Sequence, residues 1–281
     1  MRTGLWGVVA TAAALCVVML APAGASAAVA CGDEIDDDAK LQTDLDCSGF
    51  AQPGLTITGN GVDLDLNGHT INGPDDQPGI TATEKRNGLT IRDGKITGFN
   101  HAVELLFGGK NLELSNLRMN VRASNSMGAY FGEFNHADLS GLRVRNANYG
   151  TFVFASADVV TRNSVIRGGN ATGQIIGINE GDSGGHSGAI HNVKVRGATY
   201  GFYLYGPTPG FTVTDSSANG NSYAGFYLAS NDPSPYAYAL KNNVAKNNDE
   251  FGFFSAFRVP VSINNRASGN GTKDCRRVRC V

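Results

Sequence analysis

The sequence carries almost no net charge. Its 23 Lys and Arg residues nearly balance 25 Asp and Glu residues, for a formal net charge of −2, so any polyanion site must be a local patch. After residue 30 no apolar run is long enough to span a bilayer. The 37 glycines follow no Gly-X-Y period, which excludes collagen and indicates many tight turns. With 41% hydrophobic residues, the 281-residue chain can bury a sizeable core.

Residues 1–30 have the pattern of a secretory signal peptide. Arg2 is followed by an apolar run from Leu5 to Leu20 and then by small residues containing "ASA" and "AVA". A transmembrane anchor is less favoured because of this small-residue exit. A lipoprotein acylated at Cys31 is also less favoured, since "AVAC" lacks a bulky residue three before the Cys. We therefore expect a secreted, extracellular protein with no membrane insertion once the signal peptide is removed.

The rest of the chain repeats itself. The phrase "GFYLYG" at Gly201 restarts as "GFYLAS" at Gly225, 24 residues later. Segments that begin with a small residue and continue with apolar or aromatic residues recur every 22 to 27 residues. They begin at Gly79, Ala102, Gly128, Gly150, Gly177, Gly201, Gly225 and Gly252. Each repeat holds about three short alternating runs, separated by Gly, Asn, Asp or Ser turns.

Strands this short cannot close a core alone, so each repeat must stack on its neighbours. The sequence predicts an all-β fold, a single-stranded right-handed parallel β-helix (solenoid) of about nine coils. Leucine-rich repeats are the main alternative, but no Leu-x-x-Leu-x-Leu framework is sustained.

The N-terminal part of the repeat region resembles a known family. The stretch "CGDEIDDDAKLQTDLDCSGF…LTITGNGVDLDLNGHTINGP", Cys31 to Pro74, is similar to the entry of bacterial secreted right-handed β-helix repeat proteins of the pectin-lyase-like fold group. The similarity continues to about Lys273. It implies the β-helix fold and a role with sugar polymers, but no particular reaction. The catalytic motifs of polygalacturonases, pectate lyases and alginate epimerases are absent.

Four cysteines remain after signal-peptide removal, and three pairings are formally possible. About nine coils at about 4.8 Å each place the two ends of the helix roughly 35–40 Å apart, beyond the reach of a disulfide. We therefore predict the pairs Cys31–Cys47 and Cys275–Cys280. The expected organisation is a disulfide-pinned cap at 31–54, the β-helix at 55–273 and a C-terminal disulfide cap at 274–281.

A basic column is predicted along the middle coils. Arg122, Arg145, Arg167 and Arg196 each lie five or six residues before a small residue. Like charges at strand spacing repel one another, and the core does not require them. Such a stripe would suit the carboxylates of an acidic polysaccharide, which Arg binds bidentately. The alternative is a solvated face neutralised by neighbours such as Asp138 and Asp158.

The loop "INEGDSGGHSG" supplies candidate catalytic groups. Glu180 and Asp182 can form a general acid and base pair of the glycosidase kind, with His186 as an alternative base. The alternative is that these are three polar residues on a Gly-rich loop. The segments "GPTP" (206–209) and "SNDPSP" (230–235) follow at a similar phase in the next coils and would help to wall a cleft.

The aromatic and amide residues have mainly structural interpretations. The column Tyr130, Phe152, Phe202, Phe226 and Phe253 is predicted to be a stacked core. Tyr203 and Tyr227 point opposite to their Phe neighbours and are candidates for sugar stacking. A set of asparagines that precede coil starts is predicted to occupy left-handed turns or amide ladders: Asn146, Asn148, Asn170, Asn219, Asn221, Asn247 and Asn248.

Together these features predict a secreted protein that binds an extracellular, acidic polysaccharide and whose ability to cleave or modify it stays open. A non-catalytic structural or surface-adhesion module is the alternative. We expect no cofactor, no metal site, no nucleic-acid partner and a monomer. Calcium binding at the acidic run Asp33, Glu34 and Asp36 to Asp38 is a less favoured alternative to a solvated cap, because the run lacks the Gly and distal Glu of a calcium loop.

Overall fold

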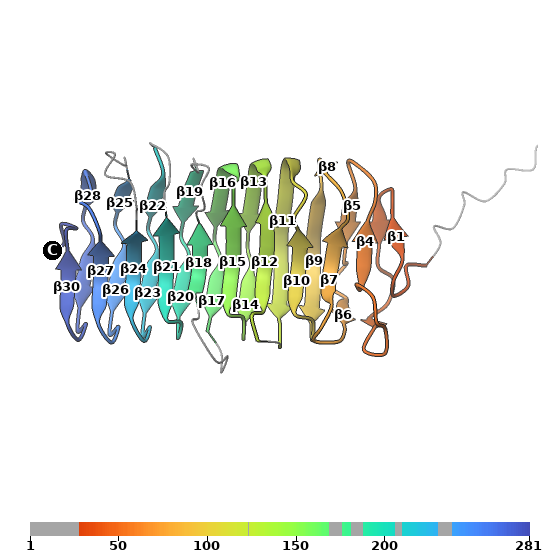
Figure 1. The fold of residues 1–281 in the computed structure, drawn as a ribbon, viewed down its shortest axis with the longest axis horizontal. Coiled ribbons are helices and arrows are strands. Elements are labelled where there is room, and N and C mark those ends of the chain that lie inside the picture. Colours follow the sequence, from red (N-terminus) through yellow and green to blue (C-terminus); the bar gives the residue numbers. More distant parts are fainter. Residues whose placement is uncertain (1–27, 123, 169–175, 181–187, 206–209, 230–237) are drawn as a thin grey trace, which may run out of the picture.

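The structure is an elongated stack of parallel strands. This computed structural model describes residues 28–122, 124–168, 176–180, 188–205, 210–229 and 238–281. These residues form strands β1 to β30 and no helix, and the two ends of the chain lie at opposite ends of the stack (Figure 1). The prediction of an all-β parallel β-helix is confirmed, and strands β4 to β27 mark about nine coils.

Three sheets run along the helix. Sheet 1 has eleven strands in the order β1-β4-β7-β10-β12-β15-β18-β21-β24-β27-β30. Its strands are β1 (Glu34–Ile35), β4 (Leu55–Ile57), β7 (Pro78–Ala82), β10 (His101–Leu105), β12 (Met127–Gly132), β15 (Tyr149–Phe154), β18 (Ile176–Glu180), β21 (Tyr200–Tyr205), β24 (Ala224–Ala229), β27 (Phe251–Ser255) and β30 (Lys273–Arg276).

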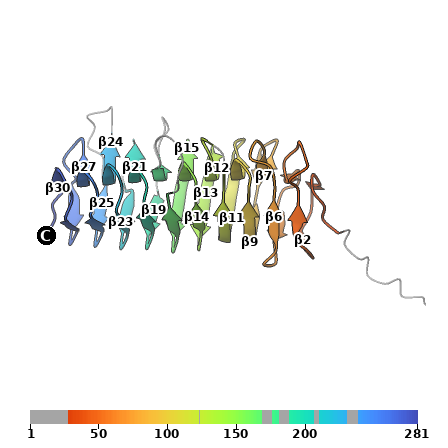
Figure 2. The same cartoon turned by 90° about the horizontal axis from the view of Figure 1, so that it is seen from below.

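Sheets 2 and 3 are continuous where two long strands bend from one into the other, β9 (Thr90–Thr97) and β11 (Gly109–Asn120). Sheet 2 also holds β2 (Ala39–Lys40), β5 (Asp63–Asp65), β8 (Arg86–Asn87), β13 (Phe134–Ser140), β16 (Ala157–Arg162), β19 (Gly188–His191), β22 (Thr212–Thr214), β25 (Ala239–Lys241) and β28 (Val261–Ile263). Sheet 3 also holds β3 (Leu45–Asp46), β6 (Thr70–Asn72), β14 (Arg143–Arg145), β17 (Val165–Arg167), β20 (Lys194–Arg196), β23 (Ser217–Asn219), β26 (Val244–Lys246) and β29 (Arg266–Ser268). Figure 2 shows the strands of both sheets along the same axis.

The recurring Gly at coil starts has a steric cause. A Cβ added at Gly201 would lie 2.5 Å from the backbone oxygen of Gly225 in the next coil, and one at Gly225 would lie 2.8 Å from that of Gly252. The aromatic residue that follows each of these glycines enters the core. Phe202, Phe226 and Phe253 are fully buried and stack face to face, at 4.5 and 4.6 Å between ring centroids. The repeated phrase therefore marks one completed coil.

The predicted aromatic core column is wrong for two of its members. Tyr130 and Phe152 are register partners of each other in the outward-facing column that contains Glu104 and Tyr203. The core positions in those coils belong instead to the small residues Ala129 and Thr151. The physical reason is strand alternation. The bulky residue in these coils stands two places after the Gly, not one.

The asparagine prediction is confirmed for Asn146, Asn221, Asn247 and Asn248, whereas Asn219 is an outward-facing residue of β23 and the buried Asn148 is bound to Ser126. Asn146 and Asn247 have left-handed backbone conformations, with φ of 59° and 53°. Asn221 and Asn248 are buried, and the Asn221 amide donates to Asn248 Oδ1 at 2.8 Å, as that of Asn248 does to Asn270 Oδ1. Asn170 lies outside the described residues. The interior turns of the C-terminal coils are therefore held by hydrogen bonds from coil to coil.

Both predicted disulfides are present, Cys31–Cys47 at one end and Cys275–Cys280 at the other. Cys47 is fully buried in the core. Residues 1–27, which contain most of the predicted signal peptide, lie outside the described part. Within the described ranges, no helix is long and apolar enough to cross a membrane.

Candidate functional site

Sheet 3 presents two rows of outward-facing residues that run along the helix axis. The inward residue between them in each strand is apolar and packed in the core, as Ile96, Met119, Val144 and Val195 are. The first row is Thr70, Lys95, Arg118, Arg143, Val165, Lys194, Ser217, Val244 and Arg266. The second row is Asn72, Thr97, Asn120, Arg145, Arg167, Arg196, Asn219, Lys246 and Ser268. From β6 to β29 neither row contains a carboxylate, whereas Asp46 of β3 is the register partner of Asn72 at the N-terminal end of the second row.

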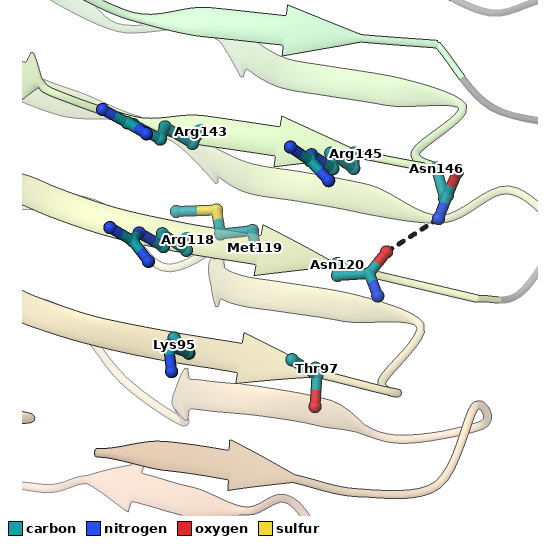
Figure 3. Close-up of a pocket in the computed structure, with 8 residues that line it drawn as sticks. All are labelled: Lys95, Thr97, Arg118, Met119, Asn120, Arg143, Arg145 and Asn146. Carbon is teal, nitrogen blue, oxygen red and sulfur yellow. Dashed lines mark hydrogen bonds between the residues drawn. The ribbon is translucent and has the colours of Figure 1, made fainter. Parts of the chain in front are cut away.

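The central part of these rows is named the cationic face. It comprises Lys95, Arg118, Arg143, Arg145, Arg167, Lys194 and Arg196. Figure 3 shows Lys95, Arg118 and Arg143 one above another on successive strands, with Thr97, Asn120 and Arg145 in the parallel row beside them.

The surface between the two rows is hollowed. A depression of about 440 Å³ is lined by residues from Lys95 to Asn146, and the Asn146 amide donates to Asn120 Oδ1 at 2.8 Å across its rim. A second depression of about 210 Å³ continues from Arg143 and Arg145 to Arg167. The two depressions share both arginines and form one shallow groove along the cationic face from Lys95 to Arg167, and Lys194 and Arg196 continue the two rows in the next coil.

Direct ion pairs do not neutralise the charges of this groove, and the carboxylate within electrostatic range of a member is Asp44, which interacts with Lys95. Among the described residues, no ion pair within 4.0 Å involves any member of the cationic face. The two acidic residues proposed as neutralising neighbours bind elsewhere, Asp138 to Arg162 at 2.6 Å and Asp158 to His136 at 2.8 Å. Both pairs lie on sheet 2, so Asp138 and Asp158 do not neutralise this stripe.

Repulsion within the row affects Arg167 most. The guanidinium of Arg196 in the next coil lowers the pKa of Arg167, with further contributions from partial desolvation and from Arg145 and Arg143. A cation held among cations is electrostatically unfavourable, and an anion placed in the groove would relieve this.

One member of the predicted Arg column is misplaced. Arg145, Arg167 and Arg196 are register partners in three successive coils, but the corresponding position in the preceding coil is Asn120. Arg122 lies two residues further on, in the turn after β11, where its backbone N–H donates to Phe99 O. The prediction counted residues back from the next coil start, and the turn at 121–126 is longer than the turn at 146–148.

The prediction also missed Lys95, Arg118, Arg143 and Lys194. The signal that identifies them is a triplet with an apolar centre and polar outer positions, as in "KIT", "RMN", "RVR" and "KVR"; in "VIR" only the last position is polar. Aligning the coils on this triplet identifies both rows, because the residues before and after the buried central residue both point outward.

The outer face of sheet 1 is aromatic. Tyr203 and Tyr227 point outward as predicted, opposite to the buried Phe202 and Phe226. Their rings stack on each other at 5.4 Å, and Tyr227 also stacks on Phe254 at 4.7 Å. Both faces of the Tyr227 ring are therefore covered by other rings, and the ring of Tyr200 also packs against it at 5.1 Å. Burial raises the pKa of Tyr203, with Tyr227 as a smaller cause, so Tyr203 stays a neutral hydroxyl donor at ordinary pH.

The predicted catalytic residues are only partly described. Glu180 is the last residue of β18, in register with Val153 and Leu204 of the flanking coils. Asp182 and His186 lie outside the described residues, so the structure does not bring the three together. Each of the three predicted loop insertions follows a strand of sheet 1, namely β18, β21 or β24, and precedes a strand of sheet 2. All three therefore connect the same two sheets.

The acidic N-terminal run has local hydrogen-bond partners. Asp33 accepts from Ala30 N at 2.7 Å, and Asp38 accepts from Asp63 N at 2.8 Å. In the described part of the chain, no group of three or more His, Cys, Asp or Glu side chains is arranged to hold a metal ion.

Comparison with known proteins gives only distant structural likeness. No family model matches the sequence, and no curated protein matches it. Among solved structures, the catalytic domain of a GH87 alpha-1,3-glucanase in complex with nigerose is similar with a TM-score of 0.40 and 12% identity. A variant of that domain in complex with tetrasaccharides has a TM-score of 0.39 at the same identity. The likeness covers 86% of this chain and 60% of the glucanase chain, and at this level it assigns no activity here.

Proposed function

We propose that this protein binds an acidic extracellular polysaccharide along the cationic face of sheet 3. The observation that carries the proposal is the register of Arg145, Arg167 and Arg196, three cations in successive coils without a carboxylate partner. Building such a row costs repulsion, which the lowered pKa of Arg167 reflects. A bound polyanion offsets that cost.

The geometry favours a ligand that lies lengthwise. Successive coils place equivalent side chains about 4.8 Å apart, so the row is a ladder of guanidinium groups along the helix axis. Each guanidinium can bind a carboxylate through two parallel N–H donors. A polymer with a carboxylate on every sugar residue matches this repetition, whereas a single small anion would contact only one guanidinium group of the row.

The proposal concerns binding outside the cytoplasm. The two disulfides support an oxidising compartment and agree with the secretion expected from residues 1–30. Catalysis is not part of the proposal. The described residues that line the groove include no carboxylate or histidine, and Asp93 lines an adjoining hollow that shares Lys95 and Arg118 with it.

The test is titration of the disulfide-formed protein with polygalacturonate and with alginate. The combined variant Arg145→Gln, Arg167→Gln, Arg196→Gln should lose affinity by about 10-fold or more, and the wild-type affinity should fall as salt is added. The matched control is Lys110→Gln, Arg162→Gln, Lys241→Gln, which removes the same charge from exposed positions of sheet 2.

Equal losses of affinity in the two triple variants would mean that net charge alone drives binding, and would contradict the proposal of a binding site on the cationic face. Unchanged binding in the groove variant would do the same. A neutral glucan, titrated in parallel, should not bind at the groove.

A further inference from the structure

The two ends of the β-helix carry opposite charge. At the N-terminal end, residues 28–50 contain carboxylates at Asp33, Glu34, Asp36, Asp37, Asp38, Asp44 and Asp46. Lys40 is the single Lys or Arg in that stretch, and it is bound to Asp65 of the next coil at 3.3 Å. Glu34, Asp36 and Asp37 are exposed and form no ion pair within the described residues.

At the C-terminal end the balance is reversed. Residues 256–281 contain Asp274 as their single acidic side chain, and their cations are Arg258, Arg266, Lys273, Arg276, Arg277 and Arg279. Arg258, Arg277 and Arg279 line a depression of about 640 Å³ together with Val259, Pro260 and Val278. This hollow is separate from the groove of the cationic face.

Within the described residues, the first and last coils also have unpaired strand edges and exposed apolar side chains. Each terminal strand, β1 to β3 at one end and β28 to β30 at the other, has strand partners on one side only. Most of the exposed large hydrophobic side chains of the described chain lie here, with Phe50 at 46% exposure in the first coil and Ile263 and Val281 at 48% and 74% in the last. Figure 1 shows that these two ends are the opposite tips of the molecule.

We propose that the acidic end of one copy docks on the basic end of a second copy, in a head-to-tail contact. The occupant of the basic hollow is then the carboxylate cluster of Glu34, Asp36 and Asp37 from the next copy. Such a contact is heterologous, because it joins two different surfaces, and without closure it continues into a filament. All strands run in one direction, so the edges that meet are compatible with parallel stacking.

The arrangement would extend the binding site. Head-to-tail stacking places the rows of sheet 3 in successive copies along one axis, so a long polyanion could engage several copies at once. Linked sites gain avidity through effective concentration without any new contact. The assembly itself does not depend on the polysaccharide, so it can be tested with the protein alone.

The first experiment is sedimentation velocity over a range of protein concentrations at about 0.01 M ionic strength, where the screening length is about 30 Å. We expect sedimentation coefficients that rise with concentration, a return to monomer at high salt, and linear particles by electron microscopy. A single monomeric species at every concentration in low salt would overturn the proposal.

Charge-reversal variants give the sharper test. One variant carries Glu34→Lys, Asp36→Lys and Asp37→Lys, and the other carries Arg258→Glu, Lys273→Glu and Arg279→Glu. The first set of changes brings the side-chain charge of residues 28–50 from −6 to 0, and the second brings that of residues 256–281 from +5 to −1. Each variant alone therefore loses the charge complementarity of its two ends and should stay monomeric, while an equimolar mixture regains opposite charges at the exchanged side chains and should associate. Failure of the mixture to associate, with both variants folded by circular dichroism, would contradict the contact.

Two controls separate this contact from other causes. The variant Lys110→Glu, Arg162→Glu, Lys241→Glu changes net charge equally on the flank and should still assemble. The groove variant Arg145→Gln, Arg167→Gln, Arg196→Gln should also assemble, whether or not it has lost polyuronate binding. If the groove variant fails to assemble, a copurified polyanion bridges the copies and the head-to-tail contact is wrong.

Discussion

Arg145 and Arg167 are register partners on neighbouring strands of sheet 3, and Arg196 continues the same row in the next coil. Like charges directly opposite each other destabilise a sheet pair, and here no carboxylate of the described chain intervenes. The row is therefore tolerated by the fold and is not a source of its stability.

This relationship predicts that Arg167→Gln stabilises the free protein. Removing the central charge relieves repulsion from both neighbours, so the denaturation midpoint should rise at low ionic strength and the gain should vanish as salt is added. The control is Arg162→Gln on sheet 2, which breaks the 2.6 Å contact with Asp138 and should give no gain. A midpoint for Arg167→Gln at or below that of wild type in low salt would show that the row is neutralised in solution.

A second prediction compares adjacent residues on opposite faces of β24. Phe226 is fully buried between Phe202 and Phe253, so Phe226→Ala should lower the free energy of unfolding by about 3–5 kcal/mol. Tyr227→Ala removes a ring of similar size from the partly exposed outer face and should cost clearly less. Equilibrium denaturation by urea measures both, and equal losses would mean that the outer aromatic column is as important for stability as the core.

The Asn ladder gives a third prediction. Asn248 accepts from the backbone and side chain of Asn221, and its amide donates to Ala218 O and Asn270 Oδ1. Asn248→Ala leaves several buried donors and acceptors without partners, at about 1–3 kcal/mol for each unsatisfied group. We expect a loss of at least about 2 kcal/mol in the free energy of unfolding. Asn135→Ala, at an exposed position of β13, is the control and should change stability little. A small effect of Asn248→Ala would mean that water replaces the ladder.

The fold could be predicted from the sequence because a solenoid repeats its local chemistry. Gly201 and Gly225 recur since each backbone is approached by the next coil, and Phe202 and Phe226 recur since they stack. Such restraints act between neighbours in the stack, so they appear in the sequence at a constant phase. The disulfide pairing followed from the same geometry, through the distance between the two ends.

The site was predicted less completely because register is set by stacking and not by counting. The turns between sheets 3 and 1 differ in length, so Arg122 has the expected spacing yet lies outside the row that Asn120 occupies. Phe152 was assigned to the core for a different reason, because it stands two places after Gly150, so strand alternation turns it outward and Thr151 fills the core position. Positions within one strand are reliable from alternation, whereas positions counted across a turn are not.

A fourth prediction concerns the two disulfides. The Cys31–Cys47 disulfide joins residues 16 positions apart, and Cys47 is fully buried, whereas the Cys275–Cys280 disulfide joins residues only 5 positions apart. Loop-closure entropy assigns about 3 kcal/mol to a bridge of the first size and less to the second. Replacing Cys31 and Cys47 by Ser should therefore open the N-terminal coil more than replacing Cys275 and Cys280 opens the last. Hydrogen exchange of the backbone amides of Ile35 and Phe253 reports the two ends separately, and equal protection in both variants would refute this ranking.

The final prediction is that acid first loosens the N-terminal coils. The pKa of Asp44 lies below its ordinary value of 3.8, chiefly because the carboxylate accepts a hydrogen bond from Thr70 N and secondly because of His69. The pKa of Asp46 is lowered as well, through hydrogen bonds from Ser48 and Asn72. A carboxyl whose folded pKa is depressed contributes stability above its unfolded pKa, and that contribution disappears as the pH falls through the folded pKa.

Amide protection in β1 to β3 should thus decrease below about pH 4, before that of β10 to β16. Asp44→Asn should weaken this pH dependence, while Asp249→Asn at the far end should leave it unchanged. Simultaneous loss of protection along the whole helix would instead indicate one cooperative unit whose acid sensitivity does not originate in the first coil.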